Sequence, residues 1–271
     1  MTHQRGSLLP PQSTSYCFYS VWWGGAGCGP RFATDILPIV CLLIGYYIEL
    51  LRHSRNQGKN YGLKLLGLNV AIIFSTFTQF VSVSSYVNSG WFSIPYNAEM
   101  HQNIDRLWQW RDSQIERAAK YTLHKSIPLI APKIDSGDIA KSAGLIQKLM
   151  DRNNLPLASP ILGKPASMTI LKLQVFNSGH TRWYGYQEAL VEKGETKIRG
   201  VFYDRNNKVI SENRFFIVGS PLPQESTEAI GEIIFPKEPG NYRLVLSFIL
   251  EGLGAFPASN SPSYSLSIVV K

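Results

Sequence analysis

The chain has 271 residues, of which 44% are hydrophobic and 17% are charged. This composition excludes a disordered polar chain, and the mean hydropathy of −0.06 excludes a protein that lies within a membrane along its whole length. Three cysteines are too few for a disulfide scaffold. A net charge of +8 would suit a nucleic acid or an anionic membrane surface, provided that the charge is spread over the chain.

The excess positive charge lies mainly in one short segment. Residues 52–64 contain no acidic side chain and four basic ones, Arg52, Arg55, Lys59 and Lys64. Residues 65–90 contain no charged side chain, and the rest of the chain is nearly balanced. Because half of the net charge is confined to this segment, no nucleic acid is expected as a partner.

Two apolar segments flank the basic one. Residues 65–87 form an uncharged run long enough to cross the hydrocarbon core of a bilayer, and we predict a transmembrane helix there. Residues 32–51 are predicted to form a second transmembrane helix, with Asp35 and Glu49 near its ends and Pro38 in its first turns. The alternative for this shorter segment is a buried core helix.

The basic segment also sets the expected topology. Lysine and arginine in short loops mark the cytoplasmic side, so residues 52–64 should form a cytoplasmic loop in a helical hairpin of the inner membrane. Both chain ends would then be extracytoplasmic. Cys17 and Cys28 would lie in that compartment, where they either pair or remain free thiols, and Cys41 would lie in the first helix.

Residues 88–164 are expected to form a helical juxtamembrane segment and a linker. Helical spacing of apolar residues predicts one helix in 105–125. A second helix is expected to begin with Ser136 as its N-cap and to carry an apolar face made of Ile139, Ala143, Ile146 and Met150. Three prolines in residues 153–165 indicate a linker.

Residues 165–271 have the pattern of an all-β sandwich. Strands are predicted at 168–176, 186–191, 197–203, 208–218, 227–235, 241–250 and 263–270, with turn residues between them. Trp183 is expected in the core, and Tyr242 lies where a tyrosine corner would be. Tyr184 and Tyr186 are expected either to stack on a sugar ring or to pack against the sheet.

Residues 1–31 are expected to form an extracytoplasmic loop rich in tryptophan and glycine. Its glycines do not form a nucleotide-binding loop, because no strand precedes them and no Lys-Ser or Lys-Thr pair follows. Trp22 and Trp23 suit a membrane interface, and Arg31 suits either a phosphate or Asp35. The alternative role is interfacial anchoring at the start of the first helix.

No catalytic, metal or cofactor site is expected. The five histidines are scattered without metal-ligand spacing, and no Gly-x-Ser-x-Gly nucleophile motif occurs.

Two sequence blocks carry a resemblance to a known family. The pattern WWGGxxxGPRFxTDxLP at residues 22–38 resembles the late extracytoplasmic loop of bacterial multi-spanning GT-C glycosyltransferases, which use polyprenyl-phosphate-linked sugars. The segment RLWQWRDSQI at 106–115 is similar to the segment that closes the membrane part of those enzymes, with Gln109 in place of their usual acid. The segments NSG at 177–179, LP at 222–223 and PGNY at 239–242, together with Trp183, resemble immunoglobulin-like domains appended to such proteins.

The resemblance implies a C-terminal part of a glycosyltransferase. The family's catalytic acid lies in an earlier loop, so this chain alone is expected to be inactive. The resemblance implies substrate-binding residues in the first block, namely Trp22, Trp23, Gly24, Gly25, Gly29, Pro30, Arg31 and Asp35. The alternative function is a non-enzymatic, membrane-tethered immunoglobulin-like module that binds envelope glycan or a partner protein.

Overall fold

The computed structural model describes residues 37–57, 61–85, 90–91, 93–96, 112–190 and 193–271. The chain divides into two compact units. The first extends to Ser84 and contains two long helices, and the second contains the β-sheet together with the segments around Trp91 and from Asp112 onward.

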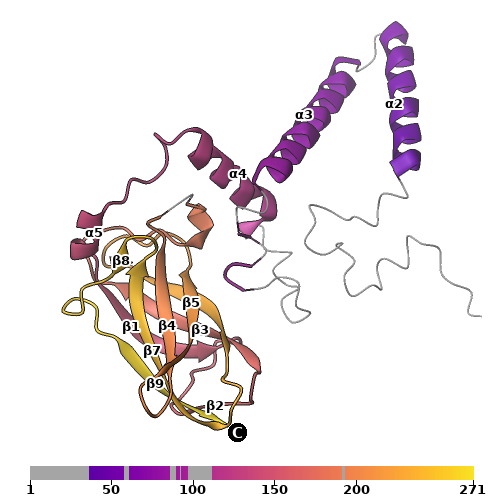
Figure 1. The fold of residues 1–271 in the computed structure, drawn as a ribbon. Coiled ribbons are helices and arrows are strands. Elements are labelled where there is room, and N and C mark those ends of the chain that lie inside the picture. Colours follow the sequence, from indigo (N-terminus) through magenta and orange to yellow (C-terminus); the bar gives the residue numbers. More distant parts are fainter. Residues whose placement is uncertain (1–36, 58–60, 86–89, 92, 97–111, 191–192) are drawn as a thin grey trace, which may run out of the picture. The chain divides into compact units, whose positions relative to one another are not determined.

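The first unit is a helical hairpin of α2 (Leu37–Gln57) and α3 (Tyr61–Ser85). Pro38 lies in the first turn of α2, where a missing N–H costs least. The hydroxyl of Tyr47 donates a hydrogen bond to the carbonyl of Lys64 at 3.5 Å, which joins the two helices. The two helices diverge from their adjoining ends, Gln57 and Tyr61 (Figure 1).

The predicted loop at 52–64 is shorter than expected. The first helix continues to Gln57 and the second begins at Tyr61, so most of the basic residues lie in helix ends. Arginine and lysine favour helices, and a change in hydropathy therefore does not end a helix.

The predicted transmembrane helices at 32–51 and 65–87 are not supported. Within the described part of the chain, no helix has both the length and the apolar character needed to cross a bilayer.

The second unit is built on one long, folded sheet. Its strands are β1 (Gly144–Asp151), β2 (Ile161–Gly163), β3 (Met168–Asn177), β4 (Thr196–Tyr203), β5 (Val209–Ile217), β6 (Ser226–Ile234), β7 (Gly240–Leu250), β8 (Gly254–Ala255) and β9 (Tyr264–Val270). The strand order is β1-β3-β6-β5-β4-β7-β9-β2, and β8 pairs with β7. All pairs are antiparallel except β2 with β9.

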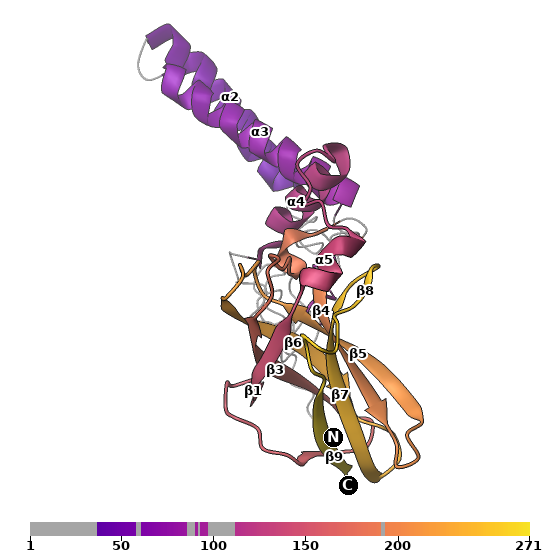
Figure 2. The same ribbon diagram turned by 90° about the vertical axis from the view of Figure 1, so that its left-hand side faces the viewer.

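The sheet folds over at the junction of β5 and β6. These strands share two paired positions, Phe216 with Ile230 and Ile217 with Ala229, whereas β3 and β6 pair over nine. The sheet therefore forms a sandwich-like arrangement in which β1, β3 and β6 face the remaining strands. In Figures 1 and 2, α5 (Ser136–Lys141) and β8 lie at one end of this unit, and the C-terminus lies at the other.

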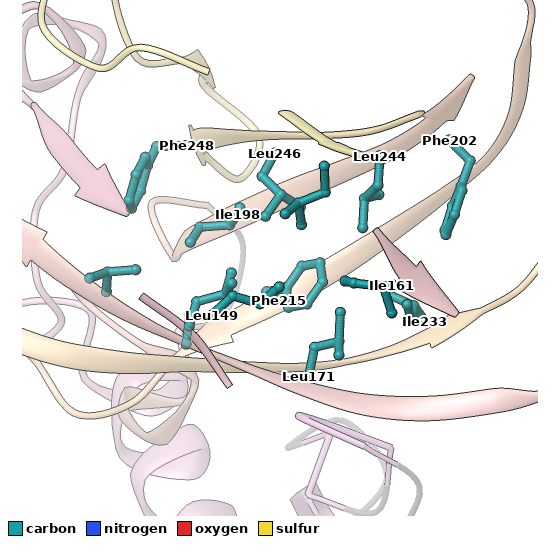
Figure 3. Packing of buried hydrophobic residues seen from close by; sticks show 14 of the residues in the cluster. Leu149, Ile161, Leu171, Ile198, Phe202, Phe215, Ile233, Leu244, Leu246 and Phe248 are labelled. Carbon is teal, nitrogen blue, oxygen red and sulfur yellow. The ribbon is translucent and has the colours of Figure 1, made fainter. Parts of the chain in front are cut away.

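The core fills the space between the two parts of the sheet. Its buried side chains come from alternate positions, as expected for strands with one face inward. Leu171 of β3 and Leu246 of β7 point into the same space (Figure 3). Trp183 is fully buried against Phe248 and Phe256, with ring centroids 5.2 and 6.0 Å apart, which confirms its predicted place in the core.

Six of the seven predicted strands are confirmed, and the tyrosine corner is present. The hydroxyl of Tyr242 donates a hydrogen bond of 2.8 Å to the carbonyl of Glu238, four residues upstream. The strand predicted at 186–191 is wrong, because this segment contains the 3-10 helix η4 (Tyr186–Glu188). Gly185 comes directly before it, and a Cβ at this position would lie 2.1 Å from the carbonyl oxygen of Ile217.

The helix predicted from Ser136 is short, and a strand follows it. Asp135 rather than Ser136 is the N-cap of α5, and its side chain accepts a hydrogen bond from the amide of Gly137 at 2.7 Å. The predicted apolar face then passes into β1, which pairs with β3. The sheet therefore begins before residue 165, and β2 lies in the segment predicted as a linker.

Candidate functional site

The site residues predicted from the first sequence block lie outside the described residues. This applies to Trp22, Trp23, Gly24, Gly25, Gly29, Pro30, Arg31 and Asp35, and also to Cys17 and Cys28. The second block is described from Asp112 onward, and its end forms the start of a helix that contacts the β-sheet unit.

This helix is α4 (Gln114–Ser126), which begins later than the helix predicted at 105–125, because Ser113 is extended. Ser113 is its N-cap, and the Ser113 hydroxyl accepts a hydrogen bond from the amide of Glu116 at 3.2 Å. His124 and Lys125 lie in the last turn, where positive charge is favourable for the helix dipole.

A buried ion pair fixes the first turns of α4. Asp112 is 4% exposed and Arg117 is 1% exposed. Arg117 Nη2 lies 2.5 Å from Asp112 Oδ1 and 2.6 Å from Oδ2, and Nε lies 3.0 Å from Oδ1. The guanidinium therefore binds both carboxylate oxygens, which is the geometry that best offsets the loss of hydration.

The ion pair also joins three segments that are distant in sequence. Arg117 Nη1 donates to the carbonyl of Ile94 at 2.9 Å, and the indole of Trp91 donates to the carbonyl of Asp112. The guanidinium lies 4.7 Å from the ring centroid of Tyr186 in η4. The pair thus holds the segment around Trp91, the helix and the β-sheet unit together.

These contacts decide the role of the predicted aromatic pair. Tyr186 is buried beneath Arg117, so the interpretation that it stacks on a sugar ring is wrong. Tyr184 is half-buried, and the guanidinium of Arg182 lies 5.5 Å from its ring centroid.

A row of alternating charges lies on the outer face of the sheet. It consists of Glu195, Lys197, Glu251, Arg214, Glu212 and Arg199. Lys197 Nζ lies 3.5 Å from a Glu195 oxygen and 3.4 Å from a Glu251 oxygen. Arg199 and Arg214 stand opposite each other on β4 and β5, and Glu212 pairs with both.

Two glutamates of this row have pKa values that are shifted in opposite directions. Burial raises the pKa of Glu195 above its usual value, although nearby Lys197 acts in the other direction. Hydrogen bonds from Arg214 and Arg199 hold the pKa of Glu212 below its usual value. Glu195 therefore carries its charge at a cost, whereas the Glu212 carboxylate is well solvated by its partners.

A cavity of about 520 Å³ lies between the end of α4, the start of α5 and the chain after η4. Its apolar lining consists of Pro128, Ala131, Pro132, Ile134 and Leu190. Its titratable lining consists of His124, Lys125, Lys133, Lys193 and Asp135. A smaller cavity of about 150 Å³ shares Lys133 and Ile134 with it and is lined further by Ser142, Thr181 and Arg182.

The sequence interpretation missed this cavity. A signal for it exists, since residues 117–134 contain four basic side chains and no acidic one, along with two prolines. Among the residues that the structure describes, no three histidine, cysteine, aspartate or glutamate side chains are grouped to hold a metal ion.

No family model and no curated protein matches this chain. Among solved structures, the chain is similar to the CARDB domain of a Pyrococcus furiosus protein, with 14% identity, a TM-score of 0.29, and coverage of 48% of this chain and 96% of that one. A crystal structure of that CARDB domain in complex with di-metal ions is similar with 12% identity and a TM-score of 0.28, and the match covers 52% of this chain and 99% of that one. The C-terminal domain of wzt is similar with 9% identity and a TM-score of 0.28, and the match covers 51% of this chain and 87% of that one.

Likenesses of this size carry no conclusion about function or ligand, and the description of the fold rests on the strand order itself. The resemblance to membrane glycosyltransferases receives no support from these comparisons. It rests on the two sequence blocks alone.

Proposed function

We propose that this chain is a non-enzymatic binding module of the bacterial cell envelope, in which the hairpin of α2 and α3 holds the β-sheet unit at a lipid bilayer. The observation that carries the proposal is the exposed apolar surface of the hairpin. On the second helix this surface includes Leu63, Leu66, Val70, Ile73, Phe74, Phe77 and Phe80. Large exposed apolar surfaces of this kind mark contacts with membranes or proteins.

Charge favours a bilayer as the occupant of this surface. All of the exposed large apolar side chains of α3 except Ile72 lie at helical spacing, so these seven form one continuous stripe. Arg52 and Lys64 lie near the adjoining ends of the two helices, and Arg52 forms an exposed ion pair with Glu49 at 3.4 Å. Basic residues beside an apolar stripe suit anionic lipid headgroups.

The proposal concerns contact with the bilayer and does not require a helix that crosses it. We also propose that both chain ends are extracytoplasmic, as expected from the sequence. We propose that the β-sheet unit binds envelope glycan or a partner protein. That unit has its own closed core, which supports its role as an independently folded binder.

Fractionation of bacterial cells that express the full chain tests the proposal. We expect the chain in the membrane fraction, and we expect the double variant Ile73→Lys with Phe74→Lys to shift to the soluble fraction. The matched control is Leu222→Lys with Ile234→Lys, which replaces two exposed apolar side chains of the β-sheet unit and should leave the chain with the membranes. A soluble wild-type chain, or a double variant that stays with the membranes, would contradict the proposal.

A further inference from the structure

We infer that the 520 Å³ cavity is a binding site for a small organic anion with an apolar body, such as a carboxylate or phosphate carried on a hydrocarbon group. The inference rests on the proposed function in that it treats the β-sheet unit as the binder. It names the class of ligand and the residues that take it.

The cavity has the dimensions and the lining of a ligand site. Small-molecule pockets commonly occupy about 300 to 1,000 Å³ and combine apolar walls with a few polar groups. Here the walls include Pro128 and Pro132, whose nitrogens carry no N–H that would need a partner. An apolar ligand body therefore meets few polar backbone donors on this side.

The charge of the lining is positive and largely uncompensated. Within the described part of the chain, the side chains of Lys125, Lys133 and Lys193 take part in no ion pair or hydrogen bond. The single acid of the lining is Asp135, whose carboxylate is engaged at the N-terminus of α5. The lining thus contains three lysines against one aspartate, and it favours an anion.

His124 adds a titratable side chain to the lining. Its Nδ1 atom is shielded from the cavity and has no hydrogen-bond partner among the described residues, so the rest of the ring faces a ligand. His124 lines the same cavity as the three lysines.

Other charged groups of this unit do not compete for the same ligand. Arg117 and the charge row on the sheet are already paired with carboxylates. The apolar stripe of the hairpin belongs to the other unit and holds no charged side chain between Leu65 and Ser85. The cavity is therefore a place in the described structure where unpaired positive charge and apolar walls occur together.

Three probes distinguish an anion site from an apolar one, with binding measured by fluorine NMR on the full chain in lipid nanodiscs. They are para-trifluoromethylbenzoate, the corresponding neutral benzyl alcohol, and trifluoroacetate. Empty nanodiscs give the amount of each probe that partitions into lipid. We expect saturable binding of the benzoate, binding of the alcohol weaker by roughly tenfold, and no saturable binding of trifluoroacetate, because both charge and apolar contact contribute.

Variants place the binding in the cavity. Lys133→Gln should weaken benzoate binding by roughly threefold to tenfold, Lys133→Arg should retain it, and Lys237→Gln, on an exposed turn, should leave it unchanged. Ala131→Phe should fill the cavity and abolish binding, and its unfolding transition shows whether the fold is kept. Equal binding of the benzoate and the alcohol, or full binding in Lys133→Gln, would overturn the inference.

A failed probe experiment is distinguishable from a failed proposed function. Cell fractionation depends on the hairpin, and the cavity lies wholly within the β-sheet unit. A negative result for probe binding therefore leaves the fractionation result unaffected, and a negative fractionation result leaves probe binding unaffected.

Discussion

Arg117 is the residue on which the attachment of α4 depends. Its guanidinium is buried with both Asp112 oxygens, the carbonyl of Ile94 and the ring of Tyr186 as neighbours. A buried pair of this kind contributes little net stability compared with well-packed apolar residues, but the loss of one partner leaves the other charge without compensation.

Arg117→Met should therefore lower the free energy of unfolding by about 3–5 kcal/mol. The measurement is urea unfolding of the full chain, followed by the fluorescence of its tryptophans. Lys125→Met in the same helix is the matched control, because this exposed side chain forms no ion pair with a described residue and its loss should cost less than about 0.5 kcal/mol. Similar losses in both variants would contradict the role given to Arg117.

Glu195 makes stability depend on pH in a defined direction. Because burial raises its pKa in the folded state, the folded chain holds this proton more tightly than the unfolded chain does. The free energy of unfolding therefore falls as the pH rises from about 4.5, the usual glutamate value, through the raised value.

Glu195→Gln should remove this part of the pH dependence. Urea unfolding at a series of pH values above about 4.5 should give a flatter profile for the variant than for the wild type. Glu238→Gln, at an exposed position, should keep the wild-type profile. An unchanged slope in Glu195→Gln would show that its carboxyl has an ordinary pKa.

At the scale of single elements, the tyrosine corner ties the turn before β7 to that strand. The hydroxyl of Tyr242 reaches the carbonyl of Glu238, as predicted from the sequence. Tyr242→Phe should lower the free energy of unfolding by about 0.5–1.5 kcal/mol, the usual net worth of one hydrogen bond. Tyr264→Phe, on the exposed side of β9, should change it by less than about 0.5 kcal/mol. Equal effects of the two changes would argue against a structural role for the corner.

The strands that the sequence predicted correctly are those with clear alternation and clear turns. β1 was missed because Ile139, Ala143, Ile146 and Met150 recur at helical spacing, and that pattern takes no account of pairing with β3. Gly144 fits the strand because a Cβ there would lie 2.9 Å from the rings of Phe248 and Trp183. Such contacts come from distant parts of the chain, and local periodicity carries no trace of them.

At the scale of the whole molecule, the sequence indicated a β-sandwich after two transmembrane helices. The structure contains the sandwich-like sheet, but no helix in the described part of the chain is long and apolar enough to cross a membrane. The sequence did not indicate the cavity, because Lys125, Lys133 and Lys193 are spread over 69 residues and are brought together by the fold. The buried role of Asp112 and Arg117 was equally hidden, since the sequence shows them as two charges on a helix that alternates in sign.

The central claim is that the hairpin holds the chain at a bilayer, and vesicle flotation tests it most directly. Purified full-length chain is mixed with vesicles containing anionic lipids and centrifuged through a density gradient. We expect the wild type and the control Leu222→Lys with Ile234→Lys to float with the vesicles, and Ile73→Lys with Phe74→Lys to remain at the bottom, because a lysine in the apolar layer costs about 2.5–3.5 kcal/mol. A wild-type chain that stays at the bottom, or a hairpin variant that floats as well as the control, would contradict the account.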